Sequence, residues 1–225
     1  MIKFNKIKKR YKNKDVIKDT SFEVKDNRIS FIMGENGAGK TTLIKCMANL
    51  EDYEGNITYG GKDIDKVRSS FFVLFDDCPF YNNLSGLDNL LIFSENKMKK
   101  NAILHFAEKI LDRNVLRSKV KTYSNGQRKK LGIILMEILK PEYIILDEIS
   151  NGLDYESLKD LKKNIKHLSS DSTILMTGHQ FDFYNDLVDD LYLFKGGAIA
   201  REDNYEKGMK KLEEVYDEKL YKARA

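Results

Sequence analysis

Runs of apolar residues separated by polar turns begin the chain and predict β-strands. Three such segments lie within the first 33 residues: Ile2–Tyr11, Thr20–Val24 and Arg28–Met33. Residues 34–39 are rich in glycine and interrupt the third strand, and a helical pattern follows over Lys40–Leu50. Residues 55–64 (GNITYGGKDI) are a hairpin candidate, and the apolar run Phe71–Phe75 predicts a buried strand. The first 33 residues are therefore predicted to be β.

The pattern becomes helical from about Leu84 to Leu139, with little strand signal. Strand patterns then return in three segments: Tyr143–Leu146, Thr173–Met176 and Leu191–Phe194. A helix predicted over Tyr155–Leu168 separates the first two of these strands. Strands that alternate with helices indicate an α/β domain with a largely parallel sheet covered on both faces. The long helical block in the middle is interpreted as an insertion into that domain.

The tail from Asn204 to Ala225 is charged, and its apolar residues recur at intervals of three to four. These apolar residues are Met209, Leu212, Tyr216 and Leu220. The spacing predicts an amphipathic helix, which either packs on its own domain or docks a partner.

The composition is that of a globular protein with a heavily solvated surface. Charged residues make up 33% of the chain, against roughly 25% in an average soluble protein. The longest apolar stretches fall far short of the roughly 18 residues of a membrane span, and the basic first residues lack the apolar segment of a secretory signal. Cys46 and Cys78 are too few for a disulfide framework or a metal cluster, and Cys46 is interpreted as a core residue of an apolar helix. We therefore expect a cytoplasmic protein.

The charge balance argues against a nucleic-acid partner. The net charge is +4, from 39 basic and 35 acidic residues, and both signs are interspersed along most of the chain. Proteins that bind nucleic acids usually cluster their basic residues on one face. The charge runs are interpreted as solvated faces.

The first chemical motif is Gly34–Thr41 (GENGAGKT), which matches G-x-x-x-x-G-K-[ST] at every fixed position. It lies directly after the predicted strand and directly before a helix, as the motif requires. Glycines let the backbone N–H groups curl around a phosphate, and the helix directs its positive N-terminal end at the same anion. Lys40 would reach the β- and γ-phosphates and the Thr41 hydroxyl would bind Mg²⁺. The motif predicts binding of a nucleoside triphosphate.

A second element is the apolar strand 143–146, which ends in Asp147 and Glu148. A carboxylate at the C-terminal end of a strand lies where open α/β sheets bind ligands. Asp147 would hold Mg²⁺ or its water shell, and Glu148 would be placed to activate water as a general base. Together with the phosphate loop, this pair predicts triphosphate hydrolysis.

Three further motifs complete the pattern. YSNGQ (123–127) lies between the two elements, SNGLD (150–154) follows the acidic pair, and His179 lies just past a later strand. In this order and at these gaps, the motifs resemble the ATP-binding cassette family, the nucleotide-binding subunits of ABC transporters, over nearly the whole chain. The resemblance implies an α/β fold: a P-loop NTPase core sheet with an N-terminal antiparallel β subdomain and an inserted α-helical subdomain. The implied divisions of this single domain, 1–225, are a nucleotide-binding core at 1–77 and 140–201, a helical insertion at about 78–139 and a helical tail at 202–225.

The resemblance also assigns roles in ATP binding and hydrolysis. Tyr11 lies where the family has an aromatic residue that stacks on adenine, and Val16 lies beside the base. Glu148 would be the catalytic base, and His179 would contact the γ-phosphate and help to order the attacking water. Nine consecutive residues would hold the phosphates: Gly34, Glu35, Asn36, Gly37, Ala38, Gly39, Lys40, Thr41 and Thr42.

The family signature implies a dimer. Its residues here are Ser124, Asn125, Gly126 and Gln127. They would contact the γ-phosphate held by a second protomer, and Asp154 matches the loop that crosses this interface. Two copies that face head to tail complete two sites, as closed two-fold symmetry allows. The resemblance leaves open whether the pair is a homodimer or a heterodimer.

Three residues depart from the family pattern. Asn125 replaces the first glycine of the signature, and asparagine tolerates a left-handed backbone better than other non-glycine residues. Ile149 stands where the family usually has proline. Asp76 occupies the place of the glutamine that contacts Mg²⁺, so the expected metal set is Thr41, Asp147 and Asp76, with Asp77 as the alternative register.

The expected function is an ATPase with ATP and Mg²⁺ as cofactors, which dimerises on ATP and powers a separately encoded transmembrane permease from the inner face of the membrane. The sequence around YSNGQ looks like that of stand-alone ATPases of export systems. The alternative is a soluble ATPase of the same family that gates a non-transport complex, such as one for iron–sulfur assembly. A P-loop kinase or small GTPase would not explain YSNGQ together with His179.

Overall fold

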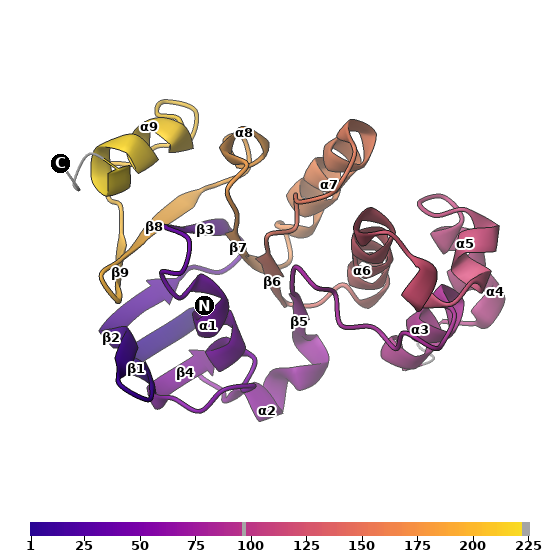
Figure 1. Ribbon diagram of the computed structural model, residues 1–225, viewed down its shortest axis with the longest axis horizontal. Helices are drawn as coiled ribbons and strands as arrows, with labels where there is room; N and C mark the ends of the chain where they lie inside the picture. The colour runs from indigo at the N-terminus through magenta and orange to yellow at the C-terminus, as the bar shows by residue number, and fades with distance from the viewer. Residues whose placement is uncertain (96–97, 222–225) are drawn as a thin grey trace.

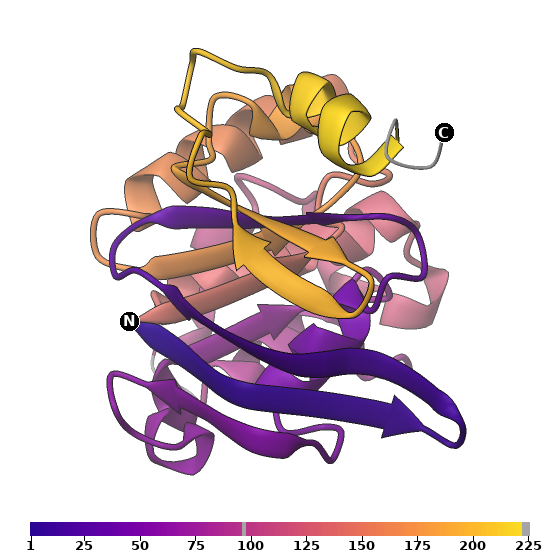
Figure 2. The same cartoon turned by 90° about the vertical axis from the view of Figure 1, so that its left-hand side faces the viewer.

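A three-stranded antiparallel sheet covers one side of the molecule (Figures 1 and 2). The computed structural model describes residues 1–95 and 98–221. The strands, in spatial order, are β2 (Lys14–Val24), β1 (Ile2–Tyr11) and β4 (Glu54–Tyr59). Ile2, Phe4 and Ile7 of β1 are buried, whereas most residues between them are exposed. The sheet therefore buries one face and leaves the other to solvent.

The second sheet has six strands in the order β5–β6–β7–β3–β8–β9. Their bounds are β3 (Ile29–Gly34), β5 (Phe71–Leu74), β6 (Tyr143–Asp147), β7 (Thr173–Thr177), β8 (Asp190–Lys195) and β9 (Ala198–Arg201). The first five are parallel, and β9 is antiparallel to β8. Every residue of β3, β6 and β7 is buried, as expected of a parallel sheet covered on both faces. The predicted α/β fold is confirmed.

Helices lie on both faces of this sheet and beyond one of its edges (Figure 1). The α-helices are α1 (Lys40–Met47), α2 (Ile64–Val67), α3 (Gly86–Phe93), α4 (Lys100–Ala107), α5 (Arg113–Arg117), α6 (Asn125–Leu139), α7 (Tyr155–Leu168), α8 (Phe181–Tyr184) and α9 (Leu212–Tyr216). Short 3₁₀ turns occupy Arg68–Ser70 and Val120–Thr122, and a π-helical turn occupies Asp217–Tyr221. In residues 1–95 and 98–221, no helix has the length and apolar character needed to cross a bilayer.

Two hydrophobic cores sandwich the parallel sheet. Ile32 and Ile145 point into the first core, with α1, which includes buried Cys46, and the antiparallel sheet. Phe31 and Ile144 point into the second core, with α6, α7 and the helices beyond them. Neighbouring strand residues serve opposite cores because side chains alternate across a strand. The sheet is thereby fixed between its helices, and its carboxyl-terminal edge presents the loops that follow β3, β6 and β7.

The hairpin predicted over 55–64 is wrong. Its first half is β4, which pairs with β1. Its second half makes only a bridge between Tyr59 and Lys62 before α2 begins at Ile64. β4 pairs with β1 instead, because the ten residues of β1 have backbone N–H and C=O groups available for an antiparallel ladder.

The tail helix is shorter than predicted, and β9 is absent from the prediction. Met209 is 83% exposed and lies before α9. The predicted helix is interrupted there because Gly208 has φ +81, a left-handed conformation that cannot continue a helix. Residues 222–225 of the predicted helix lie outside the described residues. β9 has four residues with a single apolar side chain buried, Ile199, which is too short to show a period. It lies beside β2, where Thr20 Oγ1 hydrogen-bonds both backbone groups of Ile199 (Figure 2).

Candidate functional site

The phosphate-binding loop connects β3 to α1, so the residues of the motif lie at the carboxyl end of a central strand. Gly39 precedes the helix with φ +112, and a Cβ on it would come within 2.6 Å of Val16 Cγ1. Only glycine fits this place. The backbone N–H groups at the start of α1 then face outward as an anion site, since the first turn of a helix leaves its N–H groups unpaired.

Lys40 lies folded against its own loop. Its ammonium donates to the carbonyl oxygens of Gly34 at 2.8 Å and Glu35 at 3.1 Å, and it lies 3.2 Å from His179 Nε2. Burial lowers the pKa of Lys40, while Glu148 and Asp147 nearby act to raise it. A lysine that is 7% exposed and short of water gains strongly from an anion, so this side chain fits a phosphate.

Asp147 sits at the end of β6, directly opposite Thr177 at the end of β7. Its carboxylate accepts from Thr41 Oγ1 at 2.8 Å and from Thr177 Oγ1 at 2.5 Å. Thr177 was not among the predicted site residues, although it directly precedes the Gly178–His179 pair. The start of α1 and the end of β7, which are distant in sequence, therefore meet at one buried carboxylate.

Thr41 and Asp147 present a hydroxyl and a carboxylate, which are the oxygen ligands that Mg²⁺ takes. Within the described part of the chain, no cluster of three or more His, Cys, Asp or Glu side chains could hold a metal. This agrees with Mg²⁺ in triphosphate sites, where one or two protein oxygens suffice because phosphates and waters supply the other ligands. The residues present fit the ion.

Glu148 and His179 face each other across the same edge. Glu148 Oε1 lies 3.3 Å from His179 Nε2, and Glu148 Oε2 accepts from Asn151 Nδ2 at 3.2 Å. Glu148 has φ +54, a left-handed conformation that is uncommon for a non-glycine residue. Asn151 was not predicted here, because nothing in the SNGLD motif distinguishes an amide that orients a carboxylate from a loop residue.

We expect His179 to be neutral at pH 7. Burial first and Lys40 second lower its pKa below the ordinary value of about 6.5, and Glu148 and Asp147 oppose this shift. The unfolded chain then takes up the proton before the folded chain, so folding stability falls as the pH drops through about 6.5. An NMR titration should give a His179 midpoint below about 6.5, with the resonance assigned by its loss in His179→Gln. Lys40→Met should raise the midpoint, and a midpoint at or above the ordinary value in the parent protein would contradict this environment.

Tyr11 and Val16 lie near different residues of the phosphate loop. Tyr11 is 39% exposed, its ring lies under Lys9 Nζ at 4.6 Å, and its hydroxyl interacts with the side chains of Glu51 and Thr42. Val16 lines a 420 Å³ cavity together with residues 35–38 of the loop, and Tyr11 does not line that cavity. The structure therefore places Val16 beside the phosphate loop in an open cavity and Tyr11 on the side of Thr42.

The signature residues begin α6, beyond β6 and β5 from α1 (Figure 1). Ser124 caps the helix: its hydroxyl accepts from Gln127 N at 3.2 Å, and Gln127 Oε1 accepts from Ser124 N at 2.9 Å. Asn125 is the first helical residue and needs no left-handed backbone. A Cβ on Gly126 would lie 2.7 Å from the carbonyl oxygen of Gly152. The signature thus packs on the SNGLD loop of its own chain.

Asp154 caps α7 and is tied to the signature helix. Its carboxylate accepts from Ser157 N at 2.8 Å, from Ser157 Oγ at 2.7 Å and from Lys130 Nζ at 3.1 Å. The Ser157 hydrogen bonds, then Lys130, hold the pKa of Asp154 well below its usual range. Asp154 therefore stays charged and fixed to α6.

Asp76 lies in the turn after β5 and carries a lysine partner. Its Oδ1 accepts from Lys129 Nζ at 2.7 Å, and the Asp76 side chain is 56% exposed. Asp77 is likewise exposed in the same turn. Asp76 as a metal ligand remains a prediction, and the structure adds a partner for it that the sequence did not indicate.

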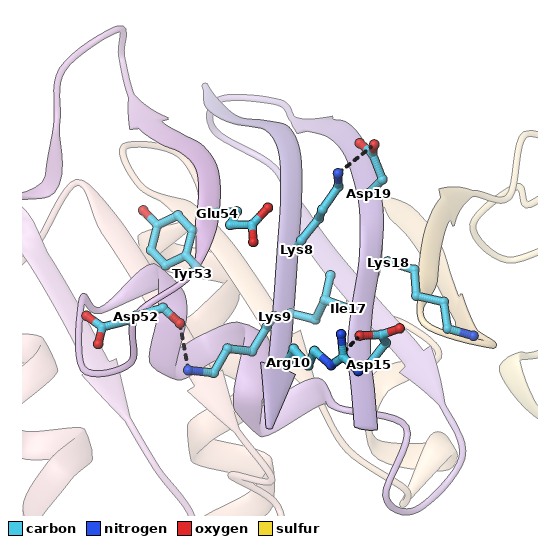
Figure 3. Close-up of a pocket in the computed structure, with 10 residues that line it drawn as sticks. All are labelled: Lys8, Lys9, Arg10, Asp15, Ile17, Lys18, Asp19, Asp52, Tyr53 and Glu54. Atoms are coloured by element: carbon cyan, nitrogen blue, oxygen red, sulfur yellow. Dashed lines mark hydrogen bonds and ion pairs between the residues drawn. The ribbon is translucent and has the colours of Figure 1, made fainter. Parts of the chain in front are cut away.

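A separate 790 Å³ hollow lies on the antiparallel sheet (Figure 3). Two ion pairs lie within its lining, Lys8 with Asp19 at 3.4 Å and Arg10 with Asp15 at 3.5 Å. The described lining contains none of the predicted site residues. The candidate site is therefore the edge formed by the loops after β3, β6 and β7.

The sequence is similar to those of known proteins. Residues 17–151 match the family model described as ABC transporter. The lantibiotic transport ATP-binding protein SrtF of Streptococcus pyogenes is 28% identical over 228 residues, covering 98% of this chain and 97% of SrtF. The uncharacterized ABC transporter ATP-binding protein YdbJ of Bacillus subtilis is 30% identical over 203 residues, covering 86% of this chain and 66% of YdbJ.

Solved structures show the same fold. An ATP-binding subunit of an ABC transporter superposes with a TM-score of 0.84 at 21% identity, covering 97% of this chain and 98% of that chain. The family match spans the phosphate loop, the signature and the acidic pair in sequence. This chain belongs to the ABC transporter family, as an ATP-binding subunit.

Proposed function

We propose that this subunit hydrolyses ATP to ADP and phosphate at the edge formed by the loops after β3, β6 and β7. The observation that carries the proposal is the meeting of Lys40, Asp147, Glu148 and His179 there, from three separate loops. Phosphoryl transfer to water needs mainly positioning and charge stabilisation, which these groups supply. The assay is release of phosphate from Mg-ATP by the purified chain.

Each group has a distinct task. Lys40 leaves the loop carbonyls and pairs with the phosphates. Thr41 and Asp147 would hold Mg²⁺. When bound there, the ion would neutralise part of the negative charge of the phosphates. Glu148 accepts the proton of the attacking water. Neutral His179, between Lys40 and Glu148, orients that water and the transferred phosphate by hydrogen bonds.

We further propose that the working unit is a dimer. Ser124 and Gln127 hydrogen-bond each other at the start of α6, whereas the phosphate loop of the same chain joins β3 to α1. An exposed helix start of this kind is an anion site for a phosphate held by another protomer. Two chains related by a two-fold axis would complete two sites, and Asp154, fixed beside the signature, would lie between them.

A permease partner is proposed to dock beside β5. A cavity of 260 Å³ opens there, and aromatic side chains line it, including Phe72, Phe80 and Phe93. Phe93 is 37% exposed and stacks on Tyr81 with ring centroids 5.6 Å apart. A short helix with apolar side chains fits such a groove. The resemblance to the family, which receives a helix of its membrane partner in this region, supports the proposal.

Phe93→Asp is expected to abolish co-purification of the chain with its membrane partner in detergent. The charge would lie in the apolar groove, where a docked helix could not solvate it. ATP affinity should change little, whereas the melting temperature should fall modestly, because Phe93 also packs against the rings of Phe80 and Tyr81. Leu50→Asp, at another exposed apolar residue, is the control and should leave partner binding intact. Equal partner binding by Phe93→Asp would exclude this groove as the docking site.

We propose that the complex exports its cargo and that this subunit sits at the inner face of the membrane. The export-type sequence around the signature supports the direction, and the transport protein SrtF supports the setting. The soluble alternative, such as an iron–sulfur assembly complex, is not favoured, because the matched family and SrtF are transport proteins. Tagged chain isolated from detergent-solubilised membranes should carry a multi-span protein. A soluble partner retained without detergent would decide for the alternative.

A further inference from the structure

Lys129 is a buried lysine outside the steps proposed for hydrolysis. It lies on α6, two residues after Gln127, and its side chain is 2% exposed. Its ammonium donates to Asp76 Oδ1 at 2.7 Å and to the backbone carbonyl oxygen of Glu148 at 2.5 Å. One side chain thus joins the signature helix, the turn after β5 and the end of β6.

The buried ammonium of Lys129 depends on the carboxylate of Asp76 for its counter-charge. An ammonium removed from water is tolerated when an opposite charge and hydrogen-bond acceptors surround it. Asp76 supplies the charge, and the Glu148 carbonyl supplies a second acceptor. The carboxylate is more than half exposed and keeps contact with water, so the lysine is the partner that the pair stabilises.

Lys129 contacts the backbone of Glu148, whose backbone conformation is strained. Glu148 has φ +54, and such a conformation persists in a non-glycine residue only where its surroundings hold it. Its N–H donates to the carbonyl oxygen of Thr177 at 3.2 Å, and its carbonyl accepts both from Lys129 Nζ at 2.5 Å and from Asn151 N at 3.1 Å. Together these bonds fix the peptide groups on both sides of the Glu148 Cα. Its carboxylate then lies 3.3 Å from His179.

We propose that Lys129 is a positioning residue for hydrolysis, which holds the backbone of Glu148 so that its carboxylate faces His179, with Asp76 as the counter-ion of Lys129. The inference rests on the proposed role of Glu148 as the base. It also links the signature helix, which binds the other protomer, to the residue that activates water. On this account, Asp76 is the counter-ion of Lys129 and not a ligand of Mg²⁺.

Lys129→Met tests the proposal, because methionine fills a similar volume without charge or donor. We expect kcat to fall about 10- to 100-fold, as for small misplacements of a catalytic group, with the KM for ATP nearly unchanged. Lys207→Met is the matched control: Lys207 also donates to a carboxylate, of Asp189 at 2.6 Å, and to a carbonyl, of Leu187 at 2.9 Å, but near the C-terminal tail. The control should keep the parent kcat. An unchanged kcat in Lys129→Met would overturn the proposal, and so would a rise in KM with kcat intact.

A structural measurement separates this inference from the proposed function. In a crystal structure of Lys129→Met, Glu148 should leave the left-handed region and its carboxylate should move away from His179. A backbone that keeps φ near +54 would overturn the positioning role, whatever the activity of the site. Failure of the proposed function would appear elsewhere, as full turnover by Glu148→Gln.

Asp76→Asn is the second variant should Lys129→Met not fold. It removes the counter-charge but keeps an oxygen acceptor for Lys129. We expect a lower kcat with the same Mg²⁺ concentration for half-maximal rate. A higher Mg²⁺ requirement would assign Asp76 to the metal, and an unchanged kcat would show that Lys129 needs no counter-ion at Asp76, so either result overturns the proposed pair.

Discussion

Glu148→Gln is expected to lower kcat for ATP hydrolysis by about 10³-fold, within the range by which a positioned base accelerates proton transfer. Glutamine keeps the size of the side chain and can still contact His179 Nε2 and Asn151, but it cannot accept the proton of the attacking water. ATP affinity should stay close to that of the parent protein, because Glu148 does not hold the phosphates in the proposed mechanism.

The same variant should accumulate as a dimer in Mg-ATP, since the triphosphate that joins the two protomers is no longer cut. Size-exclusion chromatography with light scattering measures this, alongside phosphate release. Glu206→Gln, at an exposed glutamate in the turns before α9, is the control and should behave as the parent protein. Parent-level turnover by Glu148→Gln would remove Glu148 from the role of base, and a monomer at saturating Mg-ATP would remove the shared site.

Ser124→Arg is expected to abolish dimer formation on ATP and to lower turnover at least about 100-fold, as does loss of a donor to a developing charge. The arginine side chain would project from the start of α6 into the space that the second protomer occupies in the proposed dimer. Binding of a fluorescent ATP analogue to the monomer should persist, because Ser124 caps α6, whereas the phosphate loop joins β3 to α1.

Two further variants distinguish a steric block of the proposed dimer interface from loss of the helix cap that Ser124 provides. Ser124 accepts from Gln127 N, so any replacement without an acceptor costs about 1 kcal/mol of stability. Ser124→Ala measures that cost and should lower the melting temperature slightly without preventing the dimer. Ser170→Arg, at an exposed serine after α7, adds the same bulk and charge away from the signature and should dimerise normally. Normal ATP-dependent dimerisation of Ser124→Arg would rule out the proposed interface.

Much of the fold followed from local patterns in the sequence. The bounds of β1 and α7 agree with prediction, and β3, β5, β6, β7 and β8 agree within one residue at each end. Parallel strands buried on both faces give continuous apolar runs, and these are easy to find. The errors fell where the local pattern was weak or misleading: at the first six residues of β2 (14–19), at the second half of the predicted hairpin, at the four residues of β9 and at the tail interrupted by Gly208.

The sequence by itself determined the phosphate loop, the acidic pair and the order of the motifs, because each of these consists of neighbouring residues whose backbone geometry sets their chemistry. Only the tertiary structure decided that Lys129 contacts Asp76, 53 residues away, and Glu148, 19 residues away. A lysine on a helix gives no sign in sequence that it is buried, since its burial depends on a carboxylate and a carbonyl that other strands bring to it. Contacts of this kind arise from packing between distant segments, and no local period encodes them.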